Sequence, residues 1–331
     1  MASNILEIKD LNRVFRIGGM IMGTKIKAVD DVTIKMPGDR SWIMSVVGES
    51  GSGKTTLARM ILGLLDVSSG NIVIDGLDIG EHMKHKKQFY KTVQPIFQNP
   101  FTAFSMKRTV DSYLYETALN LQMAKNKEEA KNLITETLRR VGLSLEQVEK
   151  KFPNQFSGGE LQRISIARAL ITKPKIIVAD EPVAMIDASL RMNIVNIFKN
   201  LKEEFGVSFV YITHDLSTAY YVSDYIATMY KGSMIEFGNA KVVLKNPGHP
   251  YTELLLDSIP KVGDKWSEKD RLKMKDAENK EIVETGCKFA PRCPYAKDVC
   301  FNTTPDMVSI EEEHQSLCLK HTGYQKGAAK A

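Results

Sequence analysis

The sequence contains no apolar run that approaches the roughly 20 residues needed to span a bilayer. Residues 1–7 lack the basic and apolar regions of a secretory signal peptide. We therefore expect a cytoplasmic protein, or one bound to a membrane by a partner. The net charge of +5 is too small to indicate nucleic acid as a partner. Cysteine is scarce, and all 4 cysteines fall in the last fifth of the chain. In a reducing compartment such clustering favours metal ligation over disulfides.

Apolar strands alternate with helical patterns through most of the 331 residues. The run Ser41–Val47 predicts a buried strand, and Lys54–Leu65 has helical periodicity. Lys175–Asp180 and Phe209–His214 predict two more buried strands. This alternation indicates an α/β fold with a mainly parallel sheet flanked by helices.

Other segments predict additions to that sheet. Short apolar runs within residues 5–36 indicate an antiparallel β subdomain, and residues 109–145 are mostly helical. We expect the following division: a main α/β domain over 1–260 with a helical subdomain at about 100–172, a charged linker over 261–286, a small cysteine-rich C-terminal segment over 287–324, and a flexible tail over 325–331.

A complete phosphate-binding loop follows the first buried strand. Its residues are Gly48, Glu49, Ser50, Gly51, Ser52, Gly53, Lys54 and Thr55, and Thr56 continues the helix. Glycines let backbone N–H groups converge on phosphate oxygens, and the helix N-terminus adds a partial positive charge. In this motif the lysine reaches the β and γ phosphates and the Thr55 hydroxyl ligates Mg²⁺. The sequence therefore predicts an ATP and Mg²⁺ site.

Three further polar positions follow apolar strands. Asp180 and Glu181 end one strand, His214 closes the next, and Gln98 follows Val93–Phe97. We expect Asp180 beside Mg²⁺ and Glu181 polarising the attacking water. His214 would position that water, and Gln98 would touch Mg²⁺ or water. Read alone, Asp180 and Glu181 are equally two solvated carboxylates at a strand end. His214 alone is more often a structural histidine, and Gln98 alone is an ordinary loop glutamine.

A second glycine-rich helix start lies far downstream, at Ser157, Gly158, Gly159 and Glu160. Its N–H groups and hydroxyl can bind the γ-phosphate of an ATP held by a second subunit. A simple capping box formed by Ser157 and Glu160 uses the same geometry.

Together, and in this order, these residues resemble the ATP-binding subunit of an ABC transporter over about residues 5–258. The resemblance implies a P-loop NTPase fold, ATP hydrolysis and a head-to-tail ATPase dimer. In family terms Gly48–Thr55 resembles Walker A, Gln98 the Q-loop, Ser157–Glu160 the signature, Ile176–Glu181 Walker B, Ala184–Asp187 the D-loop and His214 the switch histidine. It also implies a contact of Asp187 with the opposite subunit and an aromatic residue against adenine, for which Phe15 is the candidate.

The chain departs from the family pattern at three positions. Glu160 replaces the signature glutamine, Ala184 replaces the D-loop serine, and Asn99 replaces the acid after Gln98. None of these changes removes Lys54 or Glu181, so we expect a hydrolysing site.

The C-terminal part resembles a narrower group. Gly248–Leu255 and Gly286–Pro294 are similar to the tail of oligopeptide/dipeptide importer ATPases, and the approach to Gln98 resembles the second, F-type subunit. This resemblance implies a paralogous ATPase as heterodimer partner, two transmembrane permease subunits and an extracellular substrate-binding protein. Peptides are the favoured cargo, with oligosaccharides or nickel as alternatives.

The cysteines Cys287, Cys293, Cys300 and Cys318 are separated by five, six and seventeen residues. Four thiolates can hold a [4Fe–4S] cluster or a tetrahedral zinc ion. The intervals exceed the usual Cys-x-x-Cys of zinc sites, which favours the cluster. Free or disulfide-bonded cysteines are the remaining alternative.

Two other functions compete with the transport motor. A soluble ABC ATPase acting on DNA or ribosomes usually carries coiled coils, tandem domains or strongly basic regions, and none is evident here. A slow regulatory switch is disfavoured by Glu181 and His214. The stretch Thr109–Met123 is either core packing or part of a groove for a membrane-subunit helix.

Overall fold

The computed structural model describes residues 4–18, 24–258 and 285–322. Most of the expected charged linker (261–286) and the whole expected tail (325–331) lie outside these residues. Among the helices that are described, none is long and apolar enough to cross a membrane.

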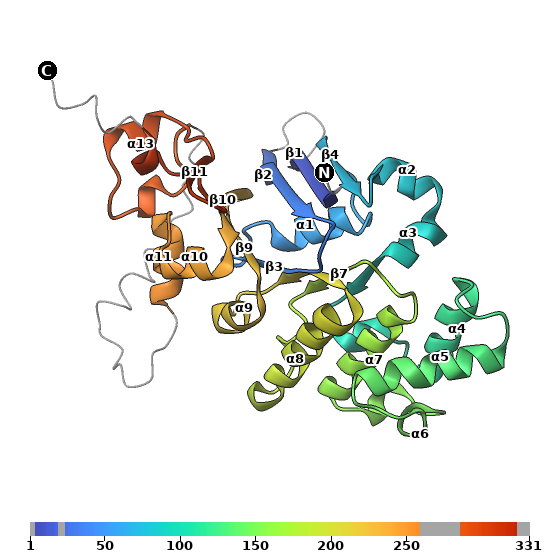
Figure 1. Cartoon of the computed structure of the whole chain (residues 1–331). Helices are drawn as coiled ribbons and strands as arrows, with labels where there is room; N and C mark the ends of the chain where they lie inside the picture. Colours follow the sequence, from blue (N-terminus) through green and yellow to red (C-terminus); the bar gives the residue numbers. More distant parts are fainter. Residues whose placement is uncertain (1–3, 19–23, 259–284, 323–331) are drawn as a thin grey trace, which may run out of the picture.

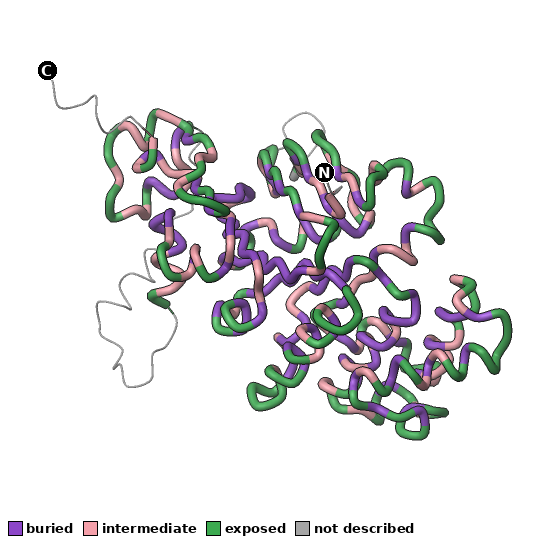
Figure 2. The backbone as a smooth tube through the Cα atoms, viewed as in Figure 1, coloured by how far each residue is buried: buried purple, intermediate pink, exposed green. Residues whose placement is uncertain are grey.

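The main sheet has eight strands, of which five are parallel neighbours. In spatial order these are β9 (Tyr225–Tyr230), β3 (Ile43–Val47), β8 (Ser208–Ile212), β7 (Ile176–Asp180) and β6 (Val93–Ile96). Strands β3, β8 and β9 are buried along their whole length (Figure 2). A parallel sheet covered on both faces needs such continuous apolar strands. The predicted α/β architecture is thus confirmed.

The two faces of this sheet border two different apolar cores. Successive residues enter opposite cores, as Ile177 and Val178 of β7 do. One core joins the sheet to the helices of the helical subdomain, and the other joins it to the β subdomain and to helix α1 (Lys54–Ile61). Helices α8 (Ala188–Phe205) and α9 (Leu216–Val222) also pack on the sheet.

A separate antiparallel sheet forms the β subdomain. Its order is β2 (Thr24–Pro37), β1 (Asn4–Ile17), β4 (Ser69–Ile74) and β5 (Leu77–Asp78). The sequence predicted short strands here, whereas β1 and β2 each run for 14 residues. Asp10 and Asp31 have positive φ and lie in or beside breaks in the β1–β2 register. Such bulges interrupt the apolar alternation without ending the strand.

The helical subdomain occupies residues between the β6 strand and the β7 strand (Figure 1). It contains η1 (Pro100–Ala103), α4 (Val110–Asn120), α5 (Lys127–Arg140), α6 (Leu145–Val148), η2 (Pro153–Gln155) and α7 (Gly158–Leu170). Helix α5 starts where Asn126 Oδ1 accepts a hydrogen bond from the Glu129 N–H at 2.9 Å. The lysine-rich stretch that precedes the helical subdomain in the chain forms α2 (Ile79–Lys84) and α3 (Lys86–Thr92).

The C-terminal segment extends the main sheet. Strand β10 (Ser233–Asn239) pairs antiparallel with β9, and the hairpin β11 (Val308–Glu311) and β12 (His314–Ser316) pairs with β10. Helices α10 (Ala240–Lys245) and α11 (Pro250–Asp257) precede the hairpin in the chain, as do η4 (Ala290–Arg292) and α13 (Asp298–Asn302), and η5 (Leu319–His321) follows it.

A buried ion pair holds this hairpin in place. His314 Nε2 lies 2.6 Å from Glu236 Oε1, and both side chains are fully buried. Glu236 also accepts hydrogen bonds from the backbone N–H groups of Gly248 and His249. One carboxylate therefore connects β10, β12 and the start of α11.

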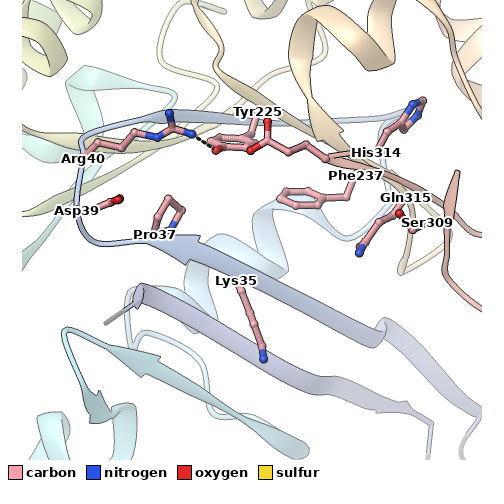
Figure 3. A pocket seen from close by; sticks show the side chains of 10 residues that line it. Lys35, Pro37, Asp39, Arg40, Tyr225, Phe237, Ser309, His314 and Gln315 are labelled. Carbon is pink, nitrogen blue, oxygen red and sulfur yellow. Dashed lines mark hydrogen bonds between the residues drawn. The ribbon is translucent and has the colours of Figure 1, made fainter. Parts of the chain in front are cut away.

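A cavity of about 390 Å³ lies where the hairpin meets the β subdomain (Figure 3). Its walls include Lys35 and Arg40 on one side and Gln315 on the other. Arg40 donates a hydrogen bond to the Tyr225 hydroxyl at 2.5 Å. The cavity marks the seam between the C-terminal segment and the rest of the chain.

Candidate nucleotide site

The phosphate loop connects β3 to α1 through glycines with positive φ. Gly48 has φ +147°, and a Cβ atom there would lie 2.2 Å from the Met229 carbonyl oxygen. Gly53 has φ +103° and its Cβ would lie 2.2 Å from the Ala28 carbonyl oxygen. Only glycine fits both positions. The loop is thus pressed between β9 and β2, with Ser50, Gly51 and Thr55 exposed to solvent.

Lys54 lies inside the loop, with only 5% of the residue exposed. Its Nζ donates hydrogen bonds to the carbonyl oxygens of Gly48 and Glu49 at 2.7 and 2.8 Å. Burial lowers the pKa of Lys54, and the carboxylates of Glu181 and Asp180 partly oppose this shift. The ammonium group therefore sits beside two acids at the centre of the candidate site.

Asp180 and Thr55 form a pair of oxygen ligands. The Thr55 hydroxyl donates to Asp180 Oδ1 at 3.2 Å, joining α1 to the end of β7. Burial raises the pKa of Asp180, the Thr55 hydrogen bond lowers it, and the adjacent Glu181 raises it. A hydroxyl and a carboxylate at a phosphate loop suit Mg²⁺, which prefers oxygen ligands.

The Glu181 carboxylate is held from both sides. Gln98 Nε2 donates to its Oε2 at 2.9 Å, and His214 Nδ1 lies 3.3 Å from its Oε1. Glu181 directly follows β7, Gln98 lies just beyond β6, and His214 lies just beyond β8. These three strands are neighbours in the sheet. The carboxyl ends of parallel strands meet at one edge, so residues distant in sequence meet there.

Glu181 itself has a positive φ of 45°. Its backbone N–H still donates to the Ile212 carbonyl oxygen at 2.9 Å, which extends the pairing of β7 with β8 by one bond. A left-handed conformation is uncommon for a residue with a Cβ, and such strain occurs often at functional sites. The His214 side chain is 62% exposed, so the site is open on this side.

Ser157 begins helix α7 in the helical subdomain. Its hydroxyl accepts a hydrogen bond from the Glu160 N–H at 3.3 Å, while Glu160 Oε2 accepts from the Ser157 N–H and hydroxyl, both at 2.9 Å. These bonds lower the pKa of Glu160. The capping box is therefore present, and a cavity of about 370 Å³ lies beside Ser157, Gly159 and Glu160.

With this geometry in place, comparison with known proteins identifies the family. A model described as "ABC transporter" matches residues 30–184, and "Oligopeptide/dipeptide transporter, C-terminal region" matches 235–300. The oligopeptide transport ATP-binding protein AppF of Bacillus subtilis is 35% identical, covering 95% of this chain and 96% of its own. The di/tripeptide transport ATP-binding protein DppF of Pseudomonas aeruginosa is 33% identical over 95% and 97% of the two chains.

The chain belongs to the ATP-binding subunits of oligopeptide/dipeptide ABC transporters. It is an ABC transporter ATPase that hydrolyses ATP, as the resemblance implied. Solved structures agree: cbiO1 from Clostridium perfringens has a TM-score of 0.63 and 26% identity over 74% of this chain and 92% of its own. The dimeric cassette MJ0796 bound to ADP and Pi has a TM-score of 0.63 and 26% identity over 71% and 98%.

Besides the signature, two further family positions, Phe15 and Asp187, lie outside the cluster around Glu181. Phe15 is on β1, and the Arg13 guanidinium carbon lies 4.7 Å from the centre of its ring. Asp187 is exposed and precedes α8 as its N-cap without a side-chain capping bond. Their roles toward adenine and toward a second subunit stay predictions.

The four cysteines are partly buried free thiols. Burial raises the pKa of Cys287 to about 11, and the thiols of Cys318, Cys293 and Cys300 shift it in the same direction. Across residues 4–18, 24–258 and 285–322, no group of three or more His, Cys, Asp or Glu side chains is arranged to hold a metal ion. The iron–sulfur prediction thus has the donor atoms it needs but not a formed coordination shell.

Sequence reasoning missed two residues that contact the phosphate loop. The Tyr251 hydroxyl accepts a hydrogen bond from the Glu49 N–H at 2.8 Å, and Arg292 donates to both Glu49 carboxylate oxygens at 2.8 Å. Both lie in the segments whose resemblance to the importer tail was noted from sequence. No periodicity or spacing connects positions more than 200 residues apart with Glu49.

Proposed function

We propose that this chain is one of two different ATPase motors of an importer that takes up di- and oligopeptides. The observation that carries the proposal is the Glu181 carboxylate between Gln98 and His214, beside a complete phosphate loop, in a chain whose C-terminal region matches that of oligopeptide/dipeptide transporters. The names of AppF, AmiF and DppF, all peptide transport ATP-binding proteins, support peptides as the cargo.

The roles of the site residues follow from their positions. Lys54 exchanges the Gly48 and Glu49 carbonyl oxygens for phosphate oxygens when ATP enters the loop. Thr55 and Asp180 would hold Mg²⁺, with Gln98 as a further candidate contact, and the ion would neutralise phosphate charge. The loop N–H groups and the N-terminus of α1 bind the remaining phosphate oxygens.

Glu181 is the candidate general base. Its carboxylate accepts a proton as water attacks the γ-phosphate, and His214 and Gln98 keep the carboxylate oriented. His214 is exposed, so a second subunit can cover this side of the site. Closure by that subunit would exclude water other than the attacking molecule.

In this proposal the second ATPase subunit also contacts this chain at the start of helix α7. Ser157, Gly158 and Gly159 present N–H groups at the start of α7, and Glu160 and Asp187 flank them. They would contact the γ-phosphate of ATP held by a paralogous partner. The dimeric state of MJ0796, a cassette of similar fold, supports such an assembly.

A groove next to Gln98 suits a membrane subunit. A cavity of about 160 Å³ is lined by Phe97, Pro100 and Arg168 among others, and Phe97 is exposed. Phe104 and Tyr113 pack edge to face with ring centres 5.3 Å apart, and the Arg168 guanidinium carbon lies 5.5 Å from the Tyr113 ring centre. In this proposal a short helix of one transmembrane permease subunit binds in this groove, and a helix of the second permease subunit binds the paralogous ATPase subunit. This chain would therefore lie at the cytoplasmic face of the membrane.

The cysteines supply the ligands of a metal centre in this proposal. Burial raises the pKa of Cys287, Cys293 and Cys318, and the neighbouring thiols add to each shift. Binding a cation would relieve this repulsion between the thiolates. A [4Fe–4S] cluster is the favoured occupant and zinc the alternative, with a structural role in either case. Measuring iron, sulfide and zinc in anaerobically purified protein decides between them, and absence of all three rejects the centre.

The function is tested on the reconstituted importer with its binding protein. We expect ATP hydrolysis to rise when the binding protein carries short peptides and to stay at the basal rate with oligosaccharides or nickel. Stimulation by a sugar alone would keep the motor and reject the peptide cargo. If the rate of ATP hydrolysis stays unchanged with every loaded binding protein, the motor function is rejected.

A further inference from the structure

The C-terminal part of the chain holds both the backbone and the side chain of Glu49 in the phosphate loop. Its N–H donates to the Tyr251 hydroxyl at 2.8 Å, and its carboxylate accepts two bonds from Arg292, each 2.8 Å long. Its carbonyl oxygen accepts from Lys54 Nζ. Every polar group of Glu49 is therefore engaged.

Arg292 is well fixed for this contact. Its side chain is 9% exposed, and its guanidinium carbon lies 5.7 Å from the ring centres of Tyr230 and Phe289. It ends the short helix η4 and directly precedes Cys293. A planar guanidinium bound to both carboxylate oxygens also fixes their orientation, which a lysine cannot do.

The aromatic cluster behind Arg292 links the loop to the cysteines. The Tyr251 ring centre lies 4.6 Å from that of Tyr230 and 5.4 Å from that of Phe289. Cys287 and Cys293 pack against the same cluster. The cluster is buried, and a close-packed interior transmits a displacement of one ring to its neighbours.

Electrostatics explains why a partner for Glu49 matters. A free carboxylate in an anion-binding loop repels the phosphates that the loop must attract. Arg292 compensates this charge and keeps the carboxylate turned toward itself. The loop then presents its N–H groups and Lys54 to the nucleotide without an opposing negative charge.

We propose that Arg292, supported by Tyr251, is a positioning residue of the ATP site, so that the cysteine-rich segment forms part of the nucleotide site of its own chain. This inference rests on the proposed role of the phosphate loop. It assigns the segment a task beyond holding a metal: it neutralises and orients Glu49.

A purely structural anchor is the competing role for Arg292, and Lys288 provides the matched control. Lys288 belongs to the same segment, and its Nζ lies 2.7 Å from Asp30 Oδ2 on β2 and donates to the Lys231 carbonyl oxygen at 2.8 Å. It thus anchors the segment without bonding to Glu49. If Arg292 only anchors the segment, replacing Arg292 or replacing Lys288 should have the same effect on ATP affinity.

The experiment measures ATP affinity of the full chain by equilibrium titration with a fluorescent ATP analogue and Mg²⁺. We expect Arg292→Met to weaken binding about tenfold, equal to about 1.4 kcal/mol. Glu49→Gln/Arg292→Met should return within about twofold of wild type, because no carboxylate is left unpaired. Lys288→Met should bind as wild type does, and Arg292→Lys should fall between wild type and Arg292→Met.

The outcomes separate the two proposals. If the wild-type chain binds no ATP, both the proposed nucleotide site and the proposed role of Arg292 are rejected. If wild type binds but Arg292→Met binds equally well, or if the double variant is not rescued, only the role of Arg292 is overturned. Thermal unfolding of each variant checks the fold, and should Arg292→Met be unfolded, the ranking of Arg292→Lys and the double variant decides the question.

Discussion

Gln98 Nε2 and Glu181 Oε2 lie 2.9 Å apart although 83 residues separate them in the chain. The bond joins the loop after β6, where the helical subdomain begins, to the candidate base at the end of β7. A change in the position of the helical subdomain therefore reaches the Glu181 carboxylate directly.

Replacing that carboxylate should stop hydrolysis while sparing binding. We expect Glu181→Gln to lower the rate of ATP hydrolysis by about 10²–10⁴-fold, the range for a general base, with ATP affinity retained. Phosphate release and equilibrium ATP binding measure the two effects. Glu203→Gln, which changes an exposed carboxylate on α8, is the control. Near-normal turnover in Glu181→Gln would refute the role of the base.

The signature carboxylate offers a test of the contact with the second subunit. Glu160 Oε2 accepts a hydrogen bond from the Ser157 hydroxyl and adds a negative charge where a γ-phosphate would bind. We expect Glu160→Gln to strengthen ATP-dependent association with the partner about three- to tenfold, in line with roughly 0.5–1.5 kcal/mol for a hydrogen bond. Analytical ultracentrifugation with ATP measures this.

Glutamine preserves the capping box, so helix α7 should remain intact in Glu160→Gln. The matched control is Glu129→Gln, since Glu129 lies at the corresponding position of α5, away from the signature: its N–H donates to Asn126 Oδ1 and its Oε2 accepts from the Lys125 N–H. Unchanged association in both variants would show that Glu160 does not face the partner's nucleotide.

Acid stability should depend on a buried histidine. Burial lowers the pKa of His249 to about 3, and the nearby Lys320 and His321 add to the shift. Above the ordinary pKa of about 6.5 the residue is neutral in both states and its contribution is complete. Below 6.5 only the unfolded chain takes up the proton, so stability falls with pH by up to about 1.4 kcal/mol per unit until about 3.

His249→Asn isolates that contribution. His249 Nδ1 accepts a hydrogen bond from the Tyr251 N–H as the N-cap of α11, and asparagine is a good N-cap that does not titrate. We expect urea unfolding at pH 7.5 and pH 5 to show a smaller loss of stability in the variant than in wild type. Equal losses would mean that His249 titrates normally in the folded chain.

The first loop glycine should tolerate no side chain. Gly48→Ala meets both a positive φ and a carbonyl oxygen at 2.2 Å, whereas Gly76→Ala meets a positive φ of 81° with nothing within 4 Å. We expect Gly76→Ala to cost about 1–2 kcal/mol of unfolding free energy. Gly48→Ala should cost more and also abolish ATP binding. Urea unfolding and nucleotide titration compare the two, and equal costs would contradict the steric argument.

The sequence predicted the parts of the site that local patterns encode. The phosphate loop, Asp180 and Glu181 each stand next to a strand or helix with a clear apolar pattern. Since parallel strands end at a common edge, the approach of His214 to Glu181 followed from the order of the elements.

Contacts across long sequence separations were not predictable in this way. The Arg292–Glu49 pair spans 243 residues and depends on how the C-terminal segment packs on β10. The bulges at Asp10 and Asp31 were also missed, because a residue of positive φ inside a strand looks like the end of that strand. In both cases tertiary packing decides what the local sequence leaves open.

The hairpin β11–β12 has a practical consequence for shortened versions of this protein. Glu236, Phe237 and Gly238 of β10 pair with β12 on one side while β9 covers the other. A chain cut before residue 308 would leave that side of β10 without its partner strand. Unpaired strand edges recruit strands from other molecules, so such a truncated protein should aggregate even if its ATP site folds.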